Sequence, residues 1–463
     1  PAVRPQLAVV YALSTDGGRN FVNPTGGAGF IALLTSTDAD KPWIATGPDA
    51  ADPTRDVVVV TYVDDRDGNP NPLVNHLDLF ARAARVTGLG AVGGFAGPGT
   101  VSGFSAEVRV NDVPAGQYTN NYAVPAVGPN GEVVIVWQNP SMGQGLVNIR
   151  LDRDPDGIAT GGTTFGTDLT PTNSFGGGFD FIRATPERAA FASPYVAYDR
   201  SGGQFNGRLY LVYADERRRV GNTLTNVNES DDFNIFVRFS DDDGRTWSNP
   251  VQVNDDSGRR SQFFQSISVD QVTGAVFVSW YDARNDLNNN AAADVDTDSR
   301  SNSEVQYFAS VSVDGGRTFR PNVRVSAQGF ASDEDRADFV PALGADGNDF
   351  GDYTAIAAFG GSAYAVWPDN SNSTGTITVP DVTPRAPAFG AGVAYPAANT
   401  PFDVYTSRLA LTSQGGLTVT VNGSDELDTF YIRLDPTGQF VQFYLFQNTL
   451  SPTPAGVPAY TAT

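Results

Sequence analysis

The sequence predicts an all-β protein built from a repeated unit. Short runs rich in valine, tyrosine, phenylalanine and isoleucine recur between clusters of glycine, aspartate, asparagine and proline, and helical periodicity is nearly absent. An apolar strand that ends in aromatic-x-Asp or aromatic-x-Asn occurs five times, with its aromatic residues 75, 76, 67 and 87 positions apart. Three or four antiparallel strands repeated at such a period are typical of the blades of a β-propeller.

The repeat divides into three strands. The aromatic-x-Asp/Asn strands are expected at 58–64, 133–139, 209–215, 275–282 and 362–369. A first strand precedes each of them, at 43–46, 122–127, 194–198, 264–269 and 353–358, and a third strand follows, at 78–85, 146–151, 233–240, 304–311 and 402–409. Segment 6–21 adds a third strand and a turn with no first or second strand before it. We therefore expect six blades, the last completed by both ends of the chain.

A second motif, Ser-x-Asp-x-Gly-x-Thr-aromatic, follows two of the third strands, at 240–247 and 312–319, and a near copy at 14–21 has Asn20 in place of threonine. The carboxylate can accept backbone hydrogen bonds within the turn, and the glycine can adopt positive φ. These turns resemble the Asp boxes of the sialidase-like (bacterial neuraminidase repeat) β-propeller family, in its secreted bacterial type. The phrases 40–45, 280–286 and 351–354 strengthen the resemblance, which covers about residues 5 to 410. In that family the Asp boxes imply architecture and not catalysis.

The pattern of strands and turns in the sequence changes after residue 411. Residues 1–411 are expected to form the Asp-box propeller, and residues 412–463 a small C-terminal β segment. This segment either supplies closing strands for the propeller or resembles the start of a bacterial surface-protein repeat, through 422–428.

Composition excludes several kinds of chemistry. With no cysteine and one histidine among 463 residues, the chain has no disulfide, no thiolate nucleophile and no multi-histidine metal site. The formal net charge of −22 disfavours nucleic acid and anionic membrane surfaces as partners. No apolar run is long enough to span a membrane, so no membrane insertion is expected.

The resemblance also says what a catalytic member should contain. A sialidase of this family is expected to carry an arginine cluster, an Arg-Ile-Pro phrase near its start, an acid/base aspartate and a tyrosine nucleophile paired with glutamate. The Arg-Ile-Pro phrase is missing from this sequence. The remaining catalytic candidates are Tyr405, Asp352, Arg260 and Arg336, and Tyr353 is a further possible ligand-face residue. The alternative is that Tyr405 is a strand aromatic and that the arginines pair with neighbouring acids.

Acidic loops make calcium the expected metal, because Ca²⁺ takes hard oxygen ligands from alternate positions of a turn. Asp152, Asp154 and Asp156 have this spacing and are followed by Gly157. Two further sets are Asp294, Asp296 and Asp298, and the looser Asp64, Asp65 and Asp67. The alternative for each set is a solvated acidic turn or, for the first, a degenerate Asp box.

These features together predict a non-catalytic, calcium-stabilised propeller that is extracellular or bound to the cell surface. Its expected partner is a glycan or a neighbouring surface protein, and self-assembly is a further expectation. The alternative function is that of a glycoside hydrolase, a divergent exo-sialidase acting on glycans.

Overall fold

The structure is a computed structural model of the chain. The residues that it describes are 7–14, 20–21, 31–36, 39–65, 77–88, 91–93, 103–112, 120–140, 145–158, 165–178, 180–182, 184–216, 218–220, 223–225, 233–257, 260–286, 304–326, 332–333, 350–369, 403–412, 415–421, 428–434, 441–447 and 460–461. These residues form strands and turns without an α-helix. The described part of the chain accordingly holds no helix that could cross a membrane.

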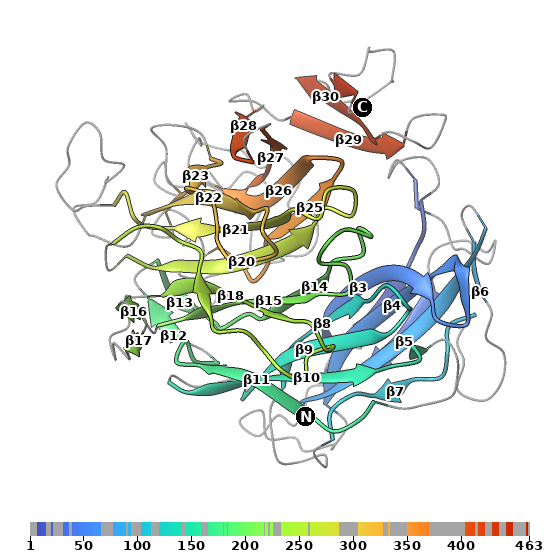
Figure 1. The fold of residues 1–463 in the computed structure, drawn as a ribbon. Helices are drawn as coiled ribbons and strands as arrows, with labels where there is room; N and C mark the ends of the chain where they lie inside the picture. The colour runs from blue at the N-terminus through green and yellow to red at the C-terminus, as the bar shows by residue number, and fades with distance from the viewer. Residues whose placement is uncertain are drawn as a thin grey trace, which may run out of the picture.

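Five of the antiparallel sheets that the described residues form follow one another along the chain, and they are here called blades 1 to 5 (Figure 1). Blade 1 contains β3 (Asp40–Asp49), β4 (Asp52–Asp65), β5 (Leu77–Gly88) and β6 (Ala91–Gly93), with β7 (Val108–Arg109) also paired to β5. Blade 2 contains β8 (Asn121–Val127), β9 (Val133–Asn139), β10 (Val147–Asp154) and β11 (Leu169–Ser174). Blade 3 contains β14 (Tyr195–Tyr198), β15 (Leu209–Asp215), β18 (Asn234–Ser240) and β19 (Val251–Gln252).

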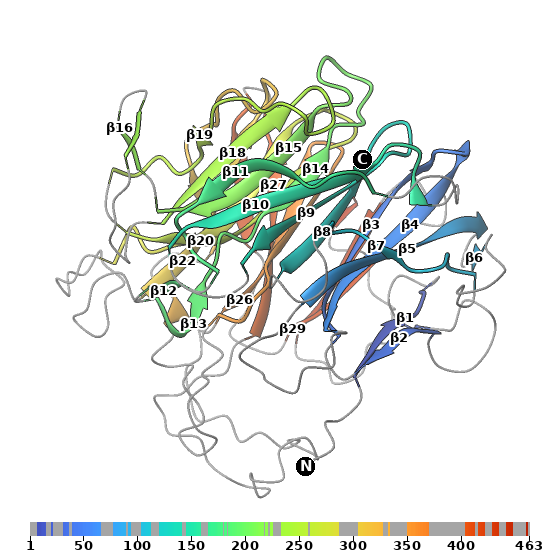
Figure 2. The same cartoon turned by 90° about the horizontal axis from the view of Figure 1, so that it is seen from below.

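Blade 4 contains β20 (Gln262–Val269), β21 (Val276–Asp282), β22 (Glu304–Ser312) and β23 (Val323–Arg324), with β24 (Ser332–Asp333) also paired to β22. Blade 5 contains β25 (Ala355–Phe359), β26 (Ser362–Asp369), β27 (Asp403–Leu411) and β28 (Leu417–Val421). The first strands pack on one another in series, β3 on β8, β8 on β14, β14 on β20 and β20 on β25 (Figure 1), and Figure 2 shows β3, β8, β14 and β20 from below. This arrangement is a β-propeller, and it confirms all five predicted strand triplets.

The predicted sixth blade is wrong for the described residues, which form five. The N-terminal strand β1 (Leu7–Tyr11) pairs with β2 (Ile31–Ser36) and not with C-terminal strands. At the other end, β28 pairs with β27 and supplies the fourth strand of blade 5. The strands β29 (Asp428–Leu434), β30 (Val441–Gln447) and β31 (Tyr460–Thr461) form a separate sheet.

Two small two-stranded sheets complete the described strands. The first pairs β12 (Asp180–Ile182) with β13 (Thr185–Ala190), and the second pairs β16 (Arg218–Val220) with β17 (Thr223–Thr225).

The second strands of blades 1 to 4 are buried on both faces, which explains their near-continuous apolar sequences. In β4, Val57, Val59 and Val63 face the core shared with blade 2. The alternate residues Val58, Val60 and Tyr62 face a second core, formed with side chains of β1 and β2. The β1–β2 sheet therefore covers the face of blade 1 that points away from blade 2.

The structure explains the two Trp-x-Asp copies of the repeated motif, whereas Trp137 of a third copy donates to Asn120 Oδ1 at 3.1 Å. Trp280 Nε1 donates a hydrogen bond of 2.8 Å to Asp282 Oδ2, and Trp367 Nε1 donates one of the same length to Asp369 Oδ2. Residues two apart on a strand point to the same face, so the carboxylate satisfies the buried indole N–H of its own strand.

The two complete Ser-x-Asp-x-Gly-x-Thr-aromatic turns form nearly the same hydrogen bonds. Asp314 Oδ1 accepts from Ser312 Oγ and from the Thr318 backbone N–H, at 2.8 and 2.9 Å, and Asp314 Oδ2 accepts from Thr318 Oγ1 at 2.6 Å. The turn at 240–247 repeats these three bonds through Asp242. Residues 15–19 of the near copy at 14–21 lie outside the described residues.

Candidate functional site

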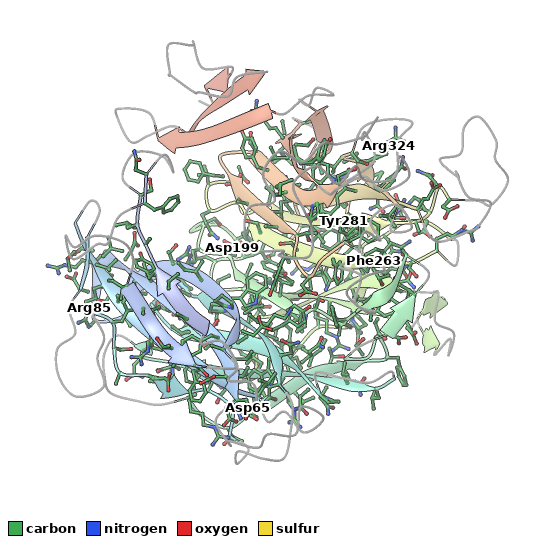
Figure 3. All side chains as sticks on the ribbon, turned by 180° about the vertical axis from the view of Figure 1, so that it is seen from behind. Asp65, Arg85, Asp199, Phe263, Tyr281 and Arg324 are labelled. Atoms are coloured by element: carbon green, nitrogen blue, oxygen red, sulfur yellow. The ribbon has the colours of Figure 1, made fainter. Side chains whose placement is uncertain are left out.

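The inner strands of the propeller begin at one end, here called the axial face, and turn into the second strands at the other end, the turn face. Figure 3 shows Asp65 and Arg85 at opposite ends of blade 1, Asp65 on the side of the axial face and Arg85 near the turn face. Four residues at equivalent places on the axial face have positive φ, namely Lys41 (51°), Tyr122 (63°), Ser193 (41°) and Phe264 (46°). Three of them lie within register shifts of the inner strands. Such bulges re-aim side chains and are enriched next to functional sites.

Neighbouring blades hold these bulges in place. Thr61 Oγ1 of blade 1 donates to the carbonyl of Ala123 in blade 2, and Thr354 Oγ1 of blade 5 donates to the carbonyl of Phe264 in blade 4 at 2.6 Å. Because the strained backbone is fixed from outside its own strand, the axial face is a preorganised surface.

Ser193 is held from both sides. Its backbone N–H donates to Gln138 Oε1 at 3.1 Å, and its carbonyl accepts from Gln265 Nε2 at 2.6 Å. The remaining polar atoms, Gln138 Nε2, Gln265 Oε1 and Ser193 Oγ, are buried without a hydrogen-bond partner among the described residues. Buried polar atoms of this kind are normally satisfied by ordered water or by a ligand.

An ion pair on the axial face joins blade 1 to blade 5. Lys41 Nζ, from the bulge of β3, lies 2.5 Å from Asp352 Oδ2, just before β25, and both side chains are 8% exposed. The ammonium group also lies 5.3 Å from the ring centroid of Tyr122 and 5.0 Å from that of Tyr353. The pair is therefore enclosed by aromatic faces, which attract a cation.

Two more aromatic rings, those of Trp43 and Tyr195, extend this group. Trp43 packs edge-on against Tyr195, with centroids 5.0 Å apart, and against Tyr353, with centroids 5.6 Å apart. Tyr195 is buried, which raises the pKa of its hydroxyl well above the usual value, and the charge of Asp352 acts in the same direction. Tyr353 is 42% exposed. We call Lys41, Trp43, Tyr122, Tyr195, Asp352 and Tyr353 the axial cluster.

The catalytic candidates occupy different elements. Asp352 belongs to the axial cluster. Arg260, just before β20, donates from Nε to the backbone carbonyl of Asp286 at 2.7 Å. Tyr405 lies on β27, the third strand of blade 5, with its ring centroid 6.1 Å from that of Trp367. Arg336 lies outside the described residues.

The first predicted metal set falls on and after β10. Asp152 Oδ1 accepts backbone hydrogen bonds from Arg153 at 2.6 Å and Gly166 at 3.0 Å, and Asp154 Oδ1 accepts one from Asp156 at 3.3 Å. The acidic group that the structure brings together is a different one, formed by Asp112, Asp152 and Asp168. It contains one of the three predicted ligands.

The other predicted metal residues divide into two kinds. Asp64 accepts a hydrogen bond of 2.5 Å from Ser36 Oγ, and Asp65 pairs with Leu77 in the β4–β5 register. Asp67, Asp294, Asp296 and Asp298 lie outside the described residues.

Sequence reasoning named Tyr353 among the possible ligand-face residues but did not single out Lys41 or Trp43. A signal for them was nevertheless present, because the phrases 40–45 and 351–354 both contribute to the axial cluster. Lys41 is also the only lysine of the chain. Asp112 and Asp168 had no local signal, since their partner Asp152 lies 40 and 16 positions away in the sequence.

No protein-family model matches the sequence, and a search of curated proteins gives no significant match. Solved structures with a similar fold include a protein of unknown function from Dyadobacter fermentans, at 14% identity and TM-score 0.42, covering 89% of this chain and 91% of that one. The intramolecular trans-sialidase from Ruminococcus gnavus gives 9% identity, TM-score 0.43 and 94% coverage of both chains. The α-L-arabinanase from Penicillium chrysogenum gives 12% identity, TM-score 0.39 and coverage of 83% and 93%.

Proposed function

We propose that the protein is a sialidase-like propeller, extracellular or on the cell surface, that binds a glycan or a neighbouring surface protein at its axial face and does not hydrolyse glycosides. The observation that carries the proposal is the ion pair between Asp352 and Lys41. A general acid or base must exchange a proton with its substrate. Lys41, enclosed with Asp352 in the axial cluster, competes with a substrate for that carboxylate.

The make-up of the axial cluster supports binding. Tyr353 offers an exposed ring, and Trp43 Nε1 is a donor without a hydrogen-bond partner among the described residues. Binding sites commonly combine aromatic surface with a few polar groups that fix orientation. An exposed ring beside an unpaired donor suits a polyhydroxylated ligand such as a glycan.

The hydrolysis part of the proposal is tested with a panel of fluorogenic sialosides and other glycosides. We expect the wild-type protein, Tyr405→Phe and Asp352→Asn all to release fluorophore no faster than buffer does. Turnover by the wild type that either substitution abolishes would contradict the proposal.

The binding part is tested by comparing two exposed aromatic side chains of blade 5 on a glycan array. Tyr353 lies on the axial face, whereas Phe359, 60% exposed, lies on the turn face. We expect Tyr353→Ala to lose glycan binding and Phe359→Ala to keep it. Equal effects of the two substitutions would contradict binding at the axial cluster.

The second candidate function is that of a glycoside hydrolase, and one observation favours it. Asp352 and the tyrosines of the axial cluster place a carboxylate near phenolic groups, the residue types that the family's catalysis requires. In this reading the approach of a substrate would have to displace Lys41 from Asp352. The fluorogenic panel separates the two functions.

A further inference from the structure

Three carboxylates from two blades converge at a place away from the axial cluster. Asp112 follows β7 of blade 1, Asp152 lies on β10 of blade 2, and Asp168 immediately precedes β11. One oxygen from each carboxylate lies within 4.8 Å of the others. Like charges at such distances repel, so the arrangement needs protons or a cation to be stable.

Two backbone hydrogen bonds fix the outer pair. The backbone N–H of Asp112 donates to Asp168 Oδ1 at 3.1 Å, and that of Asp168 donates to Asp112 Oδ2 at 2.9 Å. This reciprocal contact joins blade 1 to blade 2. It uses one oxygen of each carboxylate and sets the two groups side by side.

Asp152 provides an independent sign of a ligand. Its side chain is completely buried, and while Oδ1 accepts two backbone hydrogen bonds, Oδ2 has no partner among the described residues. Burial, together with the charges of Asp168 and Asp112, raises the pKa of Asp152 to about 7 against the opposing effect of the two backbone hydrogen bonds. An unpaired oxygen of a buried carboxylate is costly unless a proton or a cation satisfies it.

The neighbouring arginines have other partners. Arg109 and Arg150 act on Asp168 electrostatically. However, Arg109 Nη2 donates to Asp78 Oδ1 at 2.9 Å, and Arg150 Nη1 donates to Thr170 Oγ1 at 3.1 Å. The described hydrogen bonds of both guanidinium groups are thus formed with residues other than the three aspartates.

We infer that Asp112, Asp152 and Asp168 bind a calcium ion that fastens blade 1 to blade 2. Ca²⁺ accepts oxygen ligands in variable geometry and takes the remainder of its six to eight from water and backbone carbonyls. Asp112 is exposed, so solvent reaches the group from one side, while Asp152 closes the other. This site is independent of what the axial face binds.

The test compares two proposed ligands with a residue from the sequence-predicted set. The protein is stripped with a chelator, exchanged into chelator-free buffer and titrated with CaCl₂ by calorimetry, and Tm is measured with and without the metal. Ca²⁺ should raise the Tm of the wild type and of the control Asp156→Asn, because a ligand bound only by the folded state stabilises it. Asp112→Asn and Asp168→Asn should raise the calcium Kd by at least about tenfold, since each removes a charged ligand.

The metal-free Tm separates lost binding from a folding defect. Asp168→Asn keeps the shape of the side chain but removes one of three like charges, so its metal-free Tm should equal or exceed that of the wild type. With saturating Ca²⁺ the wild type should instead have the higher Tm. Any of four results would overturn the inference: no heat and no Tm shift with Ca²⁺, an unchanged Kd in Asp168→Asn, loss of binding in Asp156→Asn, or binding of MgCl₂ as tight as that of CaCl₂.

Discussion

Lys41 Nζ and Asp352 Oδ2 lie 2.5 Å apart although 311 positions separate the two residues in the sequence. The contact joins the first strand of blade 1 to the start of blade 5, so it connects the two ends of the blade series directly. Lys41 reaches it from a backbone position with φ of 51°, and Tyr122 and Tyr353 enclose the ammonium group. One ion pair thus contributes both to the closure of the propeller and to the character of its axial face.

Removing one partner of this pair should destabilise the protein. Lys41→Met leaves the Asp352 carboxylate largely buried without its cation, and we expect a loss of about 3 kcal/mol in the free energy of unfolding, measured with urea. The matched control is Arg55→Met, because Arg55 and Asp52 form an exposed pair, and it should cost much less unfolding free energy than Lys41→Met. Equal costs would show that the axial pair is not buried in solution.

Because the chain contains one lysine, the same pair can be followed chemically. We expect Lys41 to resist acetylation by an amine-reactive acetylating reagent in the folded wild type, since its side chain is 8% exposed and ion-paired. Asp352→Asn should make it react faster, and mass spectrometry of the peptide that contains Lys41 measures the rate. Rapid labelling of the wild type would contradict the enclosed geometry.

The indole of Trp367 has two roles that one substitution separates. Its ring stacks on Tyr307, with centroids 4.7 Å apart, and its N–H donates to Asp369. Trp367→Phe keeps an aromatic ring but removes the donor, and should lower the free energy of unfolding by about 2 kcal/mol. Trp247→Phe, at a half-buried turn where the indole donates to a backbone carbonyl, should cost less. A larger loss of unfolding free energy for Trp247→Phe than for Trp367→Phe would contradict the hydrogen-bond explanation of the Trp-x-Asp copies.

Blades 1 and 2 also meet at the turn face, where Gly131 leaves no room for a side chain. A Cβ at Gly131, whose φ is +87°, would lie 2.2 Å from the backbone nitrogen of Ala50. Gly131→Ala should therefore cost more than about 2 kcal/mol. Gly360→Ala, with φ of +60° and open space around the new Cβ, should cost about 1 kcal/mol. If urea unfolding gave similar losses of free energy for Gly131→Ala and Gly360→Ala, the close approach of the two turns would be contradicted.

The two complete Ser-x-Asp-x-Gly-x-Thr-aromatic turns predict a specific dependence on pH. Burial acts to raise the pKa of Asp242 and Asp314, but hydrogen bonds from the threonine and serine of each turn outweigh it and lower the pKa. A lowered pKa in the folded state gives stability above the unfolded pKa, and this stability is lost as the pH falls through the folded pKa. The difference in unfolding free energy between the wild type and Asp242→Asn/Asp314→Asn should therefore shrink below about pH 4. A difference that stays constant as the pH is lowered further below that value would refute the assignment.

The parts of the fold that were predictable from sequence are those with a local pattern. Every first, second and third strand of the five blades carries its own apolar run, and all were identified. The fourth strands β19 and β23 contain two residues each, too few for any periodicity. The predicted blade count was wrong because it depends on which strands pair. The pairing of β1 with β2 and of β28 with β27 is decided by tertiary contacts that leave no local sequence pattern.

The site residues likewise divide into those that have a local sequence pattern and those that do not. Asp352 was identified from its phrase, and Asp152 from the spacing of acids along one strand. Lys41 and Asp112 were missed because their relevance comes from partners in other blades. Carboxylates at alternate positions of a strand have the same sequence spacing as a calcium loop, so spacing predicted Asp154 and Asp156 where the structure brings Asp112 and Asp168 to Asp152.

The most direct test of the account follows binding and turnover together, by proton NMR of a panel of sialylated and neutral oligosaccharides mixed with the protein. The account predicts saturation transfer from the protein to at least one glycan, lost in Tyr353→Ala, with the glycan intact after prolonged incubation. New reducing-end signals that appear with the wild type and not with Asp352→Asn would contradict it.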